Sequence, residues 1–201
     1  MNLFLRAGAY IFHPLLMPLV GVACYFIVTP RYTDLLFAQL KLLAVAIITL
    51  FIPIVLFFLL RNLGLVSSIQ LPTAKERKIP LMIQSLLLLL IIKMVFDPYD
   101  SPEMYFFFVG ILFTSITALL LSMLRFKVSL HQMGIAGLTM FAIGLSVHFQ
   151  VNLLWVIALF FFANGWVASS RLYTQSHTYP ELIIGFFIGM IPQLILLSYW
   201  L

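Results

Sequence analysis

The sequence has 201 residues, of which 64% are hydrophobic and only 8% are charged, and its formal net charge is +5. Soluble globular chains average about 25% charged residues, so this composition excludes a water-soluble fold. The apolar runs are continuous rather than alternating, which favours membrane-spanning helices over a β-barrel. We therefore predict an all-α fold, a polytopic membrane helix bundle that forms one integral membrane domain over residues 1–201.

Hydropathy predicts about seven transmembrane helices separated by short polar connections. They are expected at about residues 10–28, 35–60, 80–96, 104–124, 132–147, 152–168 and 180–201. Pro53 is expected to distort the second helix, and the longest polar connection is expected to run from residue 61 to residue 79. Gly185 and Gly189 form a small-xxx-small pattern in the last helix, which favours close packing on a neighbouring helix.

Three polar clusters, at residues 75–78, 129–131 and 170–181, are separated from one another by pairs of predicted crossings. All three should therefore emerge on one face of the membrane. That face carries most of the Lys and Arg residues, whereas the opposite loops hold acidic residues such as Asp97 and Glu103. The positive-inside rule places the clusters on the cytoplasmic side. Ionisable residues gathered at a membrane boundary indicate a candidate functional site.

The residues of this face suit the binding of phosphate. Lys75, Arg77 and Arg171 offer charge-assisted hydrogen bonds to phosphate oxygens. Only Glu76 and Glu181 are acidic there, whereas a metal-dependent phosphotransferase needs several carboxylate or histidine ligands. We therefore expect phosphate chemistry without a metal or another cofactor, and no nucleic-acid partner.

Phosphoryl transfer without a metal needs a nucleophile and a proton donor, and two histidines can fill these roles. His177 precedes Glu181 by four residues, so a helix that begins one turn early would place both side chains on one face. A carboxylate that holds one ring nitrogen of His177 leaves the other nitrogen free to attack. His131, two residues after Ser129 in the neighbouring turn, is the candidate proton donor. His13, beside a proline in an apolar stretch, is expected to be a structural hydrogen bonder.

Two motifs resemble signatures of the type 2 phosphatidic acid phosphatase superfamily, which includes membrane lipid phosphatases and haloperoxidase-like enzymes. Residues 170–181 contain Ser-Arg-x5-His-x3-Glu and resemble the third signature, Ser-Arg-x5-His-x3-Asp. Residues 128–131, Val-Ser-Leu-His, resemble the second signature, Pro-Ser-Gly-His. Residues 75–80 stand in for the first signature, Lys-x6-Arg-Pro, which is not present as such. The chain is thus identified as a divergent member, with the resemblance covering roughly its last third.

The resemblance implies a six-helix lipid-phosphatase core, an activity and a role for each site residue. The activity would be metal-independent hydrolysis of a phosphatidate-, phosphatidylglycerophosphate- or polyprenyl-pyrophosphate-like lipid in a bacterial inner membrane. The roles would be nucleophile for His177, orientation of that histidine for Glu181, protonation of the leaving group for His131, and phosphate binding for Arg171, Ser129, Lys75 and Arg77. Many bacterial relatives would place the site outside, whereas the charge bias favours the cytoplasmic side.

The departures from the signatures leave an alternative open. Glu181 replaces an Asp, Leu130 replaces a Gly and Val128 replaces a Pro. A protein with these changes could bind or translocate lipid phosphates, or act as a scaffold, without turnover. A small transporter is a weaker alternative, because the charges lie near the ends of the predicted helices rather than at the membrane midplane.

Overall fold

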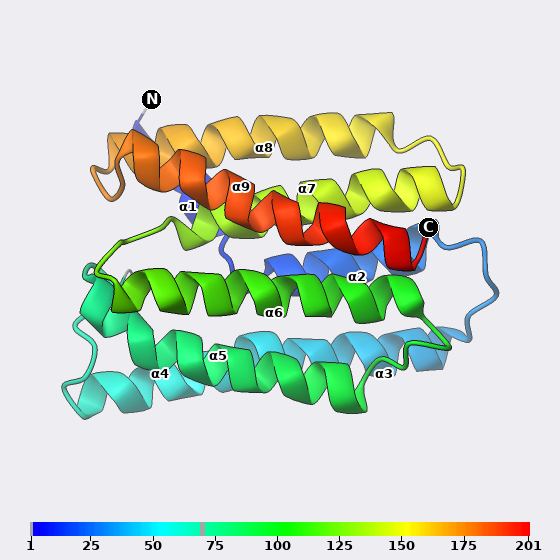
Figure 1. Cartoon of the computed structure of the whole chain (residues 1–201), viewed down its shortest axis with the longest axis horizontal. Coiled ribbons are helices and arrows are strands. Elements are labelled where there is room, and N and C mark those ends of the chain that lie inside the picture. The colour runs from blue at the N-terminus through cyan, green and yellow to red at the C-terminus, as the bar shows by residue number, and fades with distance from the viewer. Residues whose placement is uncertain (1, 69–70) are drawn as a thin grey trace.

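The computed structural model describes residues 2–68 and 71–201, which form a bundle of long helices with roughly parallel axes (Figure 1). In chain order the elements are α1 (Asn2–Ile11), α2 (Met17–Val28), α3 (Leu35–Ala46), the π-helix η1 (Ile47–Phe51), α4 (Ile52–Asn62), α5 (Ala74–Met94), α6 (Pro102–Met123), α7 (Leu130–His148), α8 (Leu154–Tyr173), α9 (Tyr179–Leu196) and the 3-10 helix η2 (Leu197–Tyr199). The described residues contain no strand, so the predicted all-α class is confirmed.

Within residues 2–68 and 71–201, five helical stretches are long and apolar enough to cross a membrane. They are Leu35–Asn62, Pro102–Met123, Leu130–His148, Leu154–Tyr173 and Tyr179–Tyr199. The predicted count of about seven is not confirmed. The 12 residues of α2 are fewer than the roughly 20 that a bilayer core requires, and α5 carries four charged residues near its start. The five long apolar helices are those expected of an integral membrane protein.

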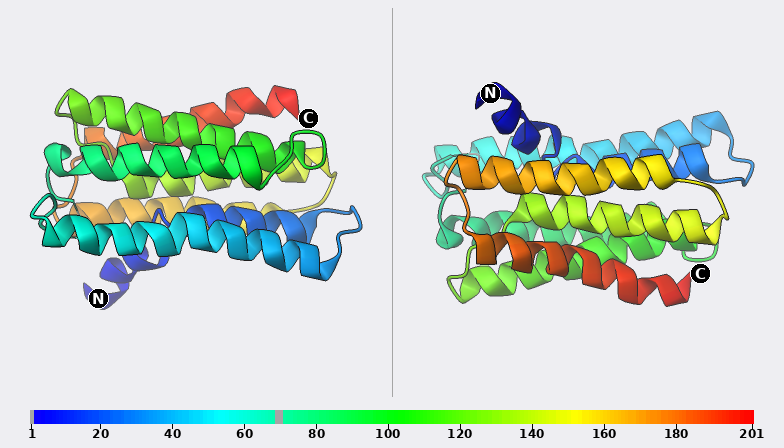
Figure 2. Two further views of the ribbon diagram at one scale, coloured as in Figure 1. Left: turned by 90° about the horizontal axis from the view of Figure 1, so that it is seen from below. Right: turned by 90° about the horizontal axis from the view of Figure 1, so that it is seen from above.

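The prediction of one helix over residues 10–28 is wrong. Helix α1 ends at Ile11 and α2 begins at Met17, with His13 and Pro14 between them. Proline disfavours helical backbone at the preceding residue and lacks an N–H donor, so the break falls at this dipeptide. Figure 2 shows α1 leaving the bundle at a steep angle, and it packs against α8 through the stacked rings of Phe4 and Trp166.

The polar connection predicted for residues 61–79 is helical in its second part. Helix α5 begins at Ala74, and Thr73 caps it by accepting a hydrogen bond from the Glu76 N–H at 3.3 Å. The Glu76 carboxylate accepts hydrogen bonds from the Thr73 hydroxyl at 3.0 Å and from the Ser67 N–H at 2.8 Å. Thr-x-x-Glu is a capping-box pattern, so the charged residues form the first turns of a helix rather than a loop.

The distortion expected at Pro53 takes the form of a widened turn. The π-helix η1 lies directly before this proline and connects α3 with α4. Proline cannot donate to the carbonyl four residues earlier and its ring crowds that carbonyl, so the preceding turn opens. Thr49, inside this turn, is fully buried and donates its hydroxyl to the carbonyl of Val45 at 2.9 Å.

Helix α7 lies at the centre of the bundle and contacts α2, α6, α8 and α9. The rings of Phe141 on α7 and Phe107 on α6 stack with their centroids 4.1 Å apart in the main apolar core. The close approach of α9 depends on Gly189, because a Cβ there would lie 2.2 Å from the backbone oxygen of Met133. The small-xxx-small pattern in the last helix therefore marks a true helix contact.

This contact predicts a large difference between two glycine substitutions. Gly189→Ala is expected to destabilise the protein by about 1–3 kcal/mol, since the new methyl group meets backbone atoms that have no room to shift. Gly165→Ala on α8 is the matched control, because nothing lies within 4 Å of its added Cβ. Alanine favours the helix at that position by up to about 1 kcal/mol. Thermal unfolding in micelles measures both, and equal melting temperatures would contradict the close α7–α9 packing.

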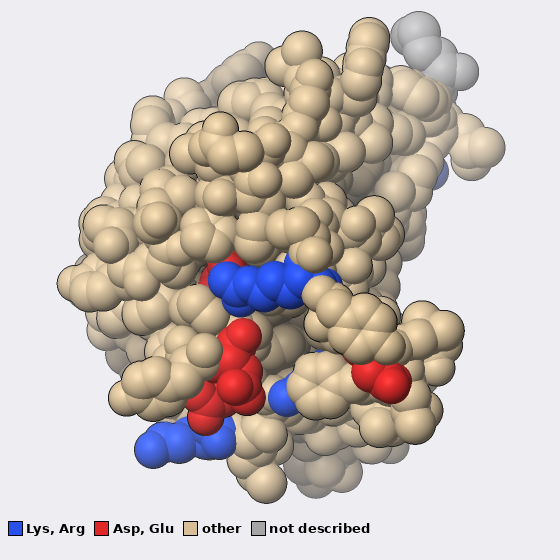
Figure 3. Space-filling model, turned by 90° about the vertical axis from the view of Figure 1, so that its right-hand side faces the viewer, with Lys and Arg blue, Asp and Glu red and all other residues tan. Residues whose placement is uncertain are grey.

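A buried ionic cluster closes the end of the bundle opposite the predicted site. Glu103 at the start of α6 is fully buried and lies 2.8 Å from an Arg31 Nη atom and 2.9 Å from His148 Nε2. The Tyr25 hydroxyl donates to the same carboxylate at 3.5 Å. Figure 3 views this end, where acidic and basic side chains gather in a largely uncharged surface. His148 thus joins a structural cluster, away from the site.

Candidate functional site

The three predicted polar clusters lie at the same end of the bundle, at the start of α5, in the α6–α7 connection and in the α8–α9 connection (Figure 1). Hydrogen bonds tie these segments together: Lys127 Nζ donates to the Ser176 carbonyl at 2.8 Å, the Ser129 N–H donates to the Glu181 carbonyl at 3.2 Å, and the Arg77 guanidinium donates to the Val128 carbonyl. The segments around both motifs are therefore held in fixed positions relative to each other.

His177 and Glu181 form a direct side-chain pair at the start of α9. Nδ1 of the buried His177 ring lies 2.8 Å from Glu181 Oε2, and the same oxygen accepts the N–H of Thr178, the N-cap residue, at 3.1 Å. A carboxylate accepts hydrogen bonds only, so the proton lies on Nδ1 and the lone pair on Nε2. The predicted contact is present, but the helix does not begin one turn early: α9 begins at Tyr179, and Glu181 in its first turn reaches back to His177, which precedes the N-cap.

The surroundings of His177 are electropositive. The histidine and Glu181 line an open pocket of about 340 Å³ together with Lys127 and Ser176. Burial is the main cause that lowers the pKa of His177 below its usual value of 6.5, and the nearby cations add to this effect, while the hydrogen bond to Glu181 opposes it. His177 is therefore neutral at pH 7, the form that a nitrogen nucleophile requires.

Arg171 ends α8 as a buried cation. Arg171 is only 5% exposed, and its Nε has no hydrogen-bond partner in the part of the chain that the structure describes. The hydroxyl of the adjacent Ser170 is also buried and without a partner among these residues. A buried guanidinium nitrogen without an acceptor is costly, so Arg171 is a candidate anion-binding residue.

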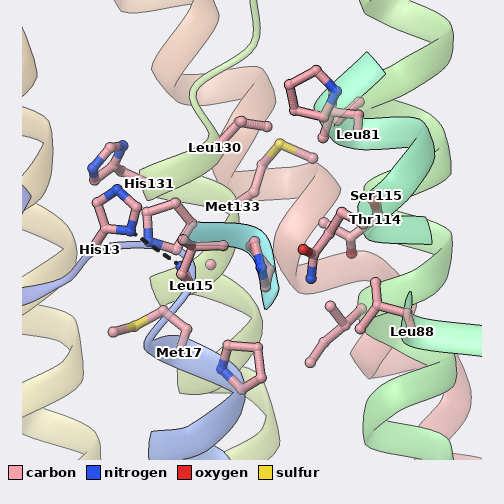
Figure 4. Close-up of a pocket in the computed structure, with 18 of the residues that line it drawn as sticks. His13, Leu15, Met17, Leu81, Leu88, Thr114, Ser115, Leu130, His131 and Met133 are labelled. Atoms are coloured by element: carbon pink, nitrogen blue, oxygen red, sulfur yellow. Dashed lines mark hydrogen bonds between the residues drawn. The ribbon is translucent and has the colours of Figure 1, made fainter. Parts of the chain in front are cut away.

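His131 lies at the start of α7 and contacts His13, a residue that lies outside the two motifs. Its ring meets that of His13 edge-on, with the centroids 5.2 Å apart (Figure 4). The ring of His13 accepts a hydrogen bond from the Leu15 N–H at 3.4 Å, so the expected structural hydrogen bond exists. Burial and Arg171 lower the pKa of His13. The only signal for this residue in the sequence was a His-Pro pair in an apolar stretch.

The predicted residues divide between two cavities. His131, Arg171 and Arg77 line a cavity of about 370 Å³ inside the bundle, whereas His177 and Glu181 line the open pocket. The two histidines do not share one cavity in this structure.

The other three predicted phosphate ligands differ from Arg171 in their burial or in their hydrogen bonds. Ser129 is fully buried and caps α7, where its hydroxyl accepts the Gln132 N–H at 3.4 Å. Arg77 is buried, and its Nε donates to the carbonyl of Leu71 at 3.1 Å. Lys75 is exposed on the first turn of α5 and lines neither cavity. Arg171 is the predicted ligand with a buried, unpartnered nitrogen.

Neither family models, nor curated proteins, nor solved structures match this chain. Across residues 2–68 and 71–201, no three His, Cys, Asp or Glu side chains are grouped closely enough to hold a metal ion. The two motifs, and the geometry of the residues that they contribute, are therefore the features that point to a function.

Proposed function

We propose that the protein is a membrane phosphatase that hydrolyses a lipid phosphate or pyrophosphate through a phosphohistidine, without a metal. The observation that carries this proposal is the 2.8 Å contact between His177 Nδ1 and Glu181 Oε2, which leaves Nε2 free within an electropositive pocket. The resemblance of residues 128–131 and 170–181 to the phosphatase signatures supports the same function.

In the proposed reaction, Nε2 of His177 attacks phosphorus, and an N–P bond forms as the P–O bond to the lipid breaks. The leaving oxygen takes a proton from His131 on the adjacent α7 turn. Water then attacks phosphorus and gives a proton to His131, the N–P bond breaks, and inorganic phosphate and free His177 are released. Arg171 and Lys127 stabilise the charge on the phosphoryl oxygens during both steps.

The test is release of inorganic phosphate by purified protein in nanodiscs that contain phosphatidate, phosphatidylglycerophosphate or a polyprenyl pyrophosphate, with a chelator present. Release from at least one of these lipids is expected, with an acid-labile phosphoryl group trapped on His177 at early times. Folded protein that releases no phosphate from any of them would overturn the proposal. The cationic end of the bundle, which holds the site, is proposed to face the cytoplasm of a bacterial inner membrane.

The environment of His177 predicts the pH dependence of hydrolysis. The nucleophile must be neutral, and its pKa is lowered, so the acid-side fall in kcat/KM is expected below pH 6.5. Lys127→Gln removes a cation that lowers this pKa, so the fall should move to higher pH. Lys78→Gln on α5 serves as the control with an unchanged profile. Profiles recorded between about pH 4 and about pH 8 test this, and a wild-type fall above 6.5 would contradict it.

A binding protein without turnover is the second candidate. The placement of His131 and His177 in separate cavities, and the use of Ser129 as a helix cap, favour it. Such a protein could present or translocate lipid phosphates, or act as a scaffold. Tight lipid-phosphate binding that is unchanged in His131→Ala, together with no phosphate release, would select this candidate over the enzyme.

A further inference from the structure

The cavity of about 370 Å³ is lined mainly by residues of α2, α4, α5, α6 and α7 (Figure 4). Arg171, in the last turn of α8, also lines it. The volume of the cavity lies within the range of roughly 300–1,000 Å³ found for small-molecule sites. Most of its lining is hydrocarbon, including Pro18, Phe57, Leu87 and Ile111. The cavity is therefore shaped and lined for an apolar group.

Three of the polar side chains that line the cavity, Thr114, Ser115 and Gln193, have protein partners. Thr114 donates to the Gly110 carbonyl at 2.9 Å, Gln193 Nε2 donates to the Phe107 carbonyl at 3.0 Å, and the hydroxyls of Ser115 and Ser85 lie 3.1 Å apart. These groups satisfy one another or the backbone, so they make little demand on a ligand. Gln84 is a further polar residue of the lining, and most of the remaining wall is apolar.

One end of the cavity has a different character. His13, His131 and Arg171 meet there, and the Arg171 Nε is buried without a partner among the described residues. A guanidinium in such a site is stabilised by an anion that accepts its hydrogen bonds. The cavity thus has one cationic end and a long apolar remainder, which is the complement of an anionic amphiphile.

The wall formed by α4 connects the cavity with the outer surface of the bundle. Ile54 and Phe58 line the cavity, and they are also 37% and 55% exposed. The stretch to which they belong, Leu35–Asn62, is one of those apolar enough to cross a membrane. A chain that enters between these residues would come directly from the lipid.

We propose that this cavity binds one hydrocarbon chain of a long-chain phosphate ester, with its phosphate end against Arg171, His13 and His131. The proposal deepens the proposed phosphatase function and rests on it for turnover: His177 lines the open pocket, so hydrolysis requires the phosphate held at Arg171 to reach that pocket. Any second chain of the lipid would stay in the bilayer. His13, from the α1–α2 connection, becomes a residue of the phosphate end.

Two adjacent leucines on α5 provide a matched test. Leu87 lines the cavity, whereas Leu86 does not line it and is 60% exposed toward the outer surface. Leu87→Trp should fill the cavity and lower the ratio of kcat/KM for hexadecyl phosphate to kcat/KM for butyl phosphate at least about tenfold. Leu86→Trp should match wild type on both esters. For wild type, kcat/KM should rise about threefold to fourfold with each added methylene until the chain fills the cavity.

Binding without turnover separates this inference from the phosphatase function. Hexadecylphosphonate, which cannot be hydrolysed, should raise the melting temperature of wild type and of Leu86→Trp, but not of Leu87→Trp. Butylphosphonate and hexadecyltrimethylammonium should have no such effect, because one lacks the chain and the other lacks the anion. If no lipid is hydrolysed but this pattern holds, the cavity site stands and the enzyme proposal fails. If both tryptophan variants behave alike, the cavity site is refuted, whatever the enzyme does.

Discussion

His177→Asn is expected to reduce phosphate release from the lipid substrate by at least about a thousandfold, because it removes the proposed nucleophile. Asparagine retains a polar group near Glu181 Oε2, which lies 2.8 Å from the wild-type ring. The same variant should give no trapped phosphoryl group. Phosphate release in nanodiscs, measured with a chelator present, is the readout.

The control for this variant is Tyr173→Phe, which removes a hydroxyl from an exposed side chain at the end of α8, outside both cavities. Both variants should keep the wild-type melting temperature, so a loss of activity in His177→Asn alone cannot come from unfolding. A His177→Asn protein that still turns over at more than about one tenth of the wild-type rate would remove the phosphohistidine from the mechanism.

Glu103→Ala is expected to cause the largest loss of stability of any single charge removal. Breaking a buried ion pair by removing one partner costs about 3–5 kcal/mol, because the other partner stays desolvated. The Arg31 side chain is 46% exposed and can be hydrated once Glu103 is removed. We therefore expect the free energy of unfolding to fall by about 3 kcal/mol, the lower end of this range. His148, which is less exposed, loses its partner altogether. Thermal or denaturant unfolding in micelles measures the change.

Asp100→Ala is the matched control, since this exposed carboxylate lies in the same connection before α6. It should change the free energy of unfolding by no more than about 0.5 kcal/mol. Phosphatase activity at the other end of the bundle should survive in folded Glu103→Ala protein. Equal stabilities of the two variants would show that the buried cluster does not hold this end together.

Much of the helical architecture follows from the sequence, because long apolar runs between polar turns leave the chain few other structures in a membrane. The errors fall where short-range chemistry competes with hydropathy. Pro14 divides a run that is apolar enough to read as one helix, and Thr73 and Glu76 begin α5 within a stretch that reads as a polar loop. Capping and proline signals were present, but hydropathy outweighed them.

The site shows the same division between local and distant information. The pairing of His177 with Glu181 depends on four-residue spacing at a helix start, which a sequence displays directly. His13 and His131 are 118 positions apart in the sequence, and their contact depends on how the chain around α1 and α2 packs on α7. Sequence spacing alone does not predict such a contact. The pairing of Glu103 with His148 across 45 positions is hidden for the same reason.

The π-helix η1 acts as a one-residue insertion in the helix that runs from Leu35 to Asn62. Each residue turns a helix by about 100°, so everything after η1 is rotated by that angle relative to an unbroken α-helix. This rotation determines which residues of α4 face the interior, and Phe57 is one of those that line the cavity. The helical register of a single turn therefore determines which side chains can form the cavity wall, and Pro53 maintains that register by preventing the turn from tightening.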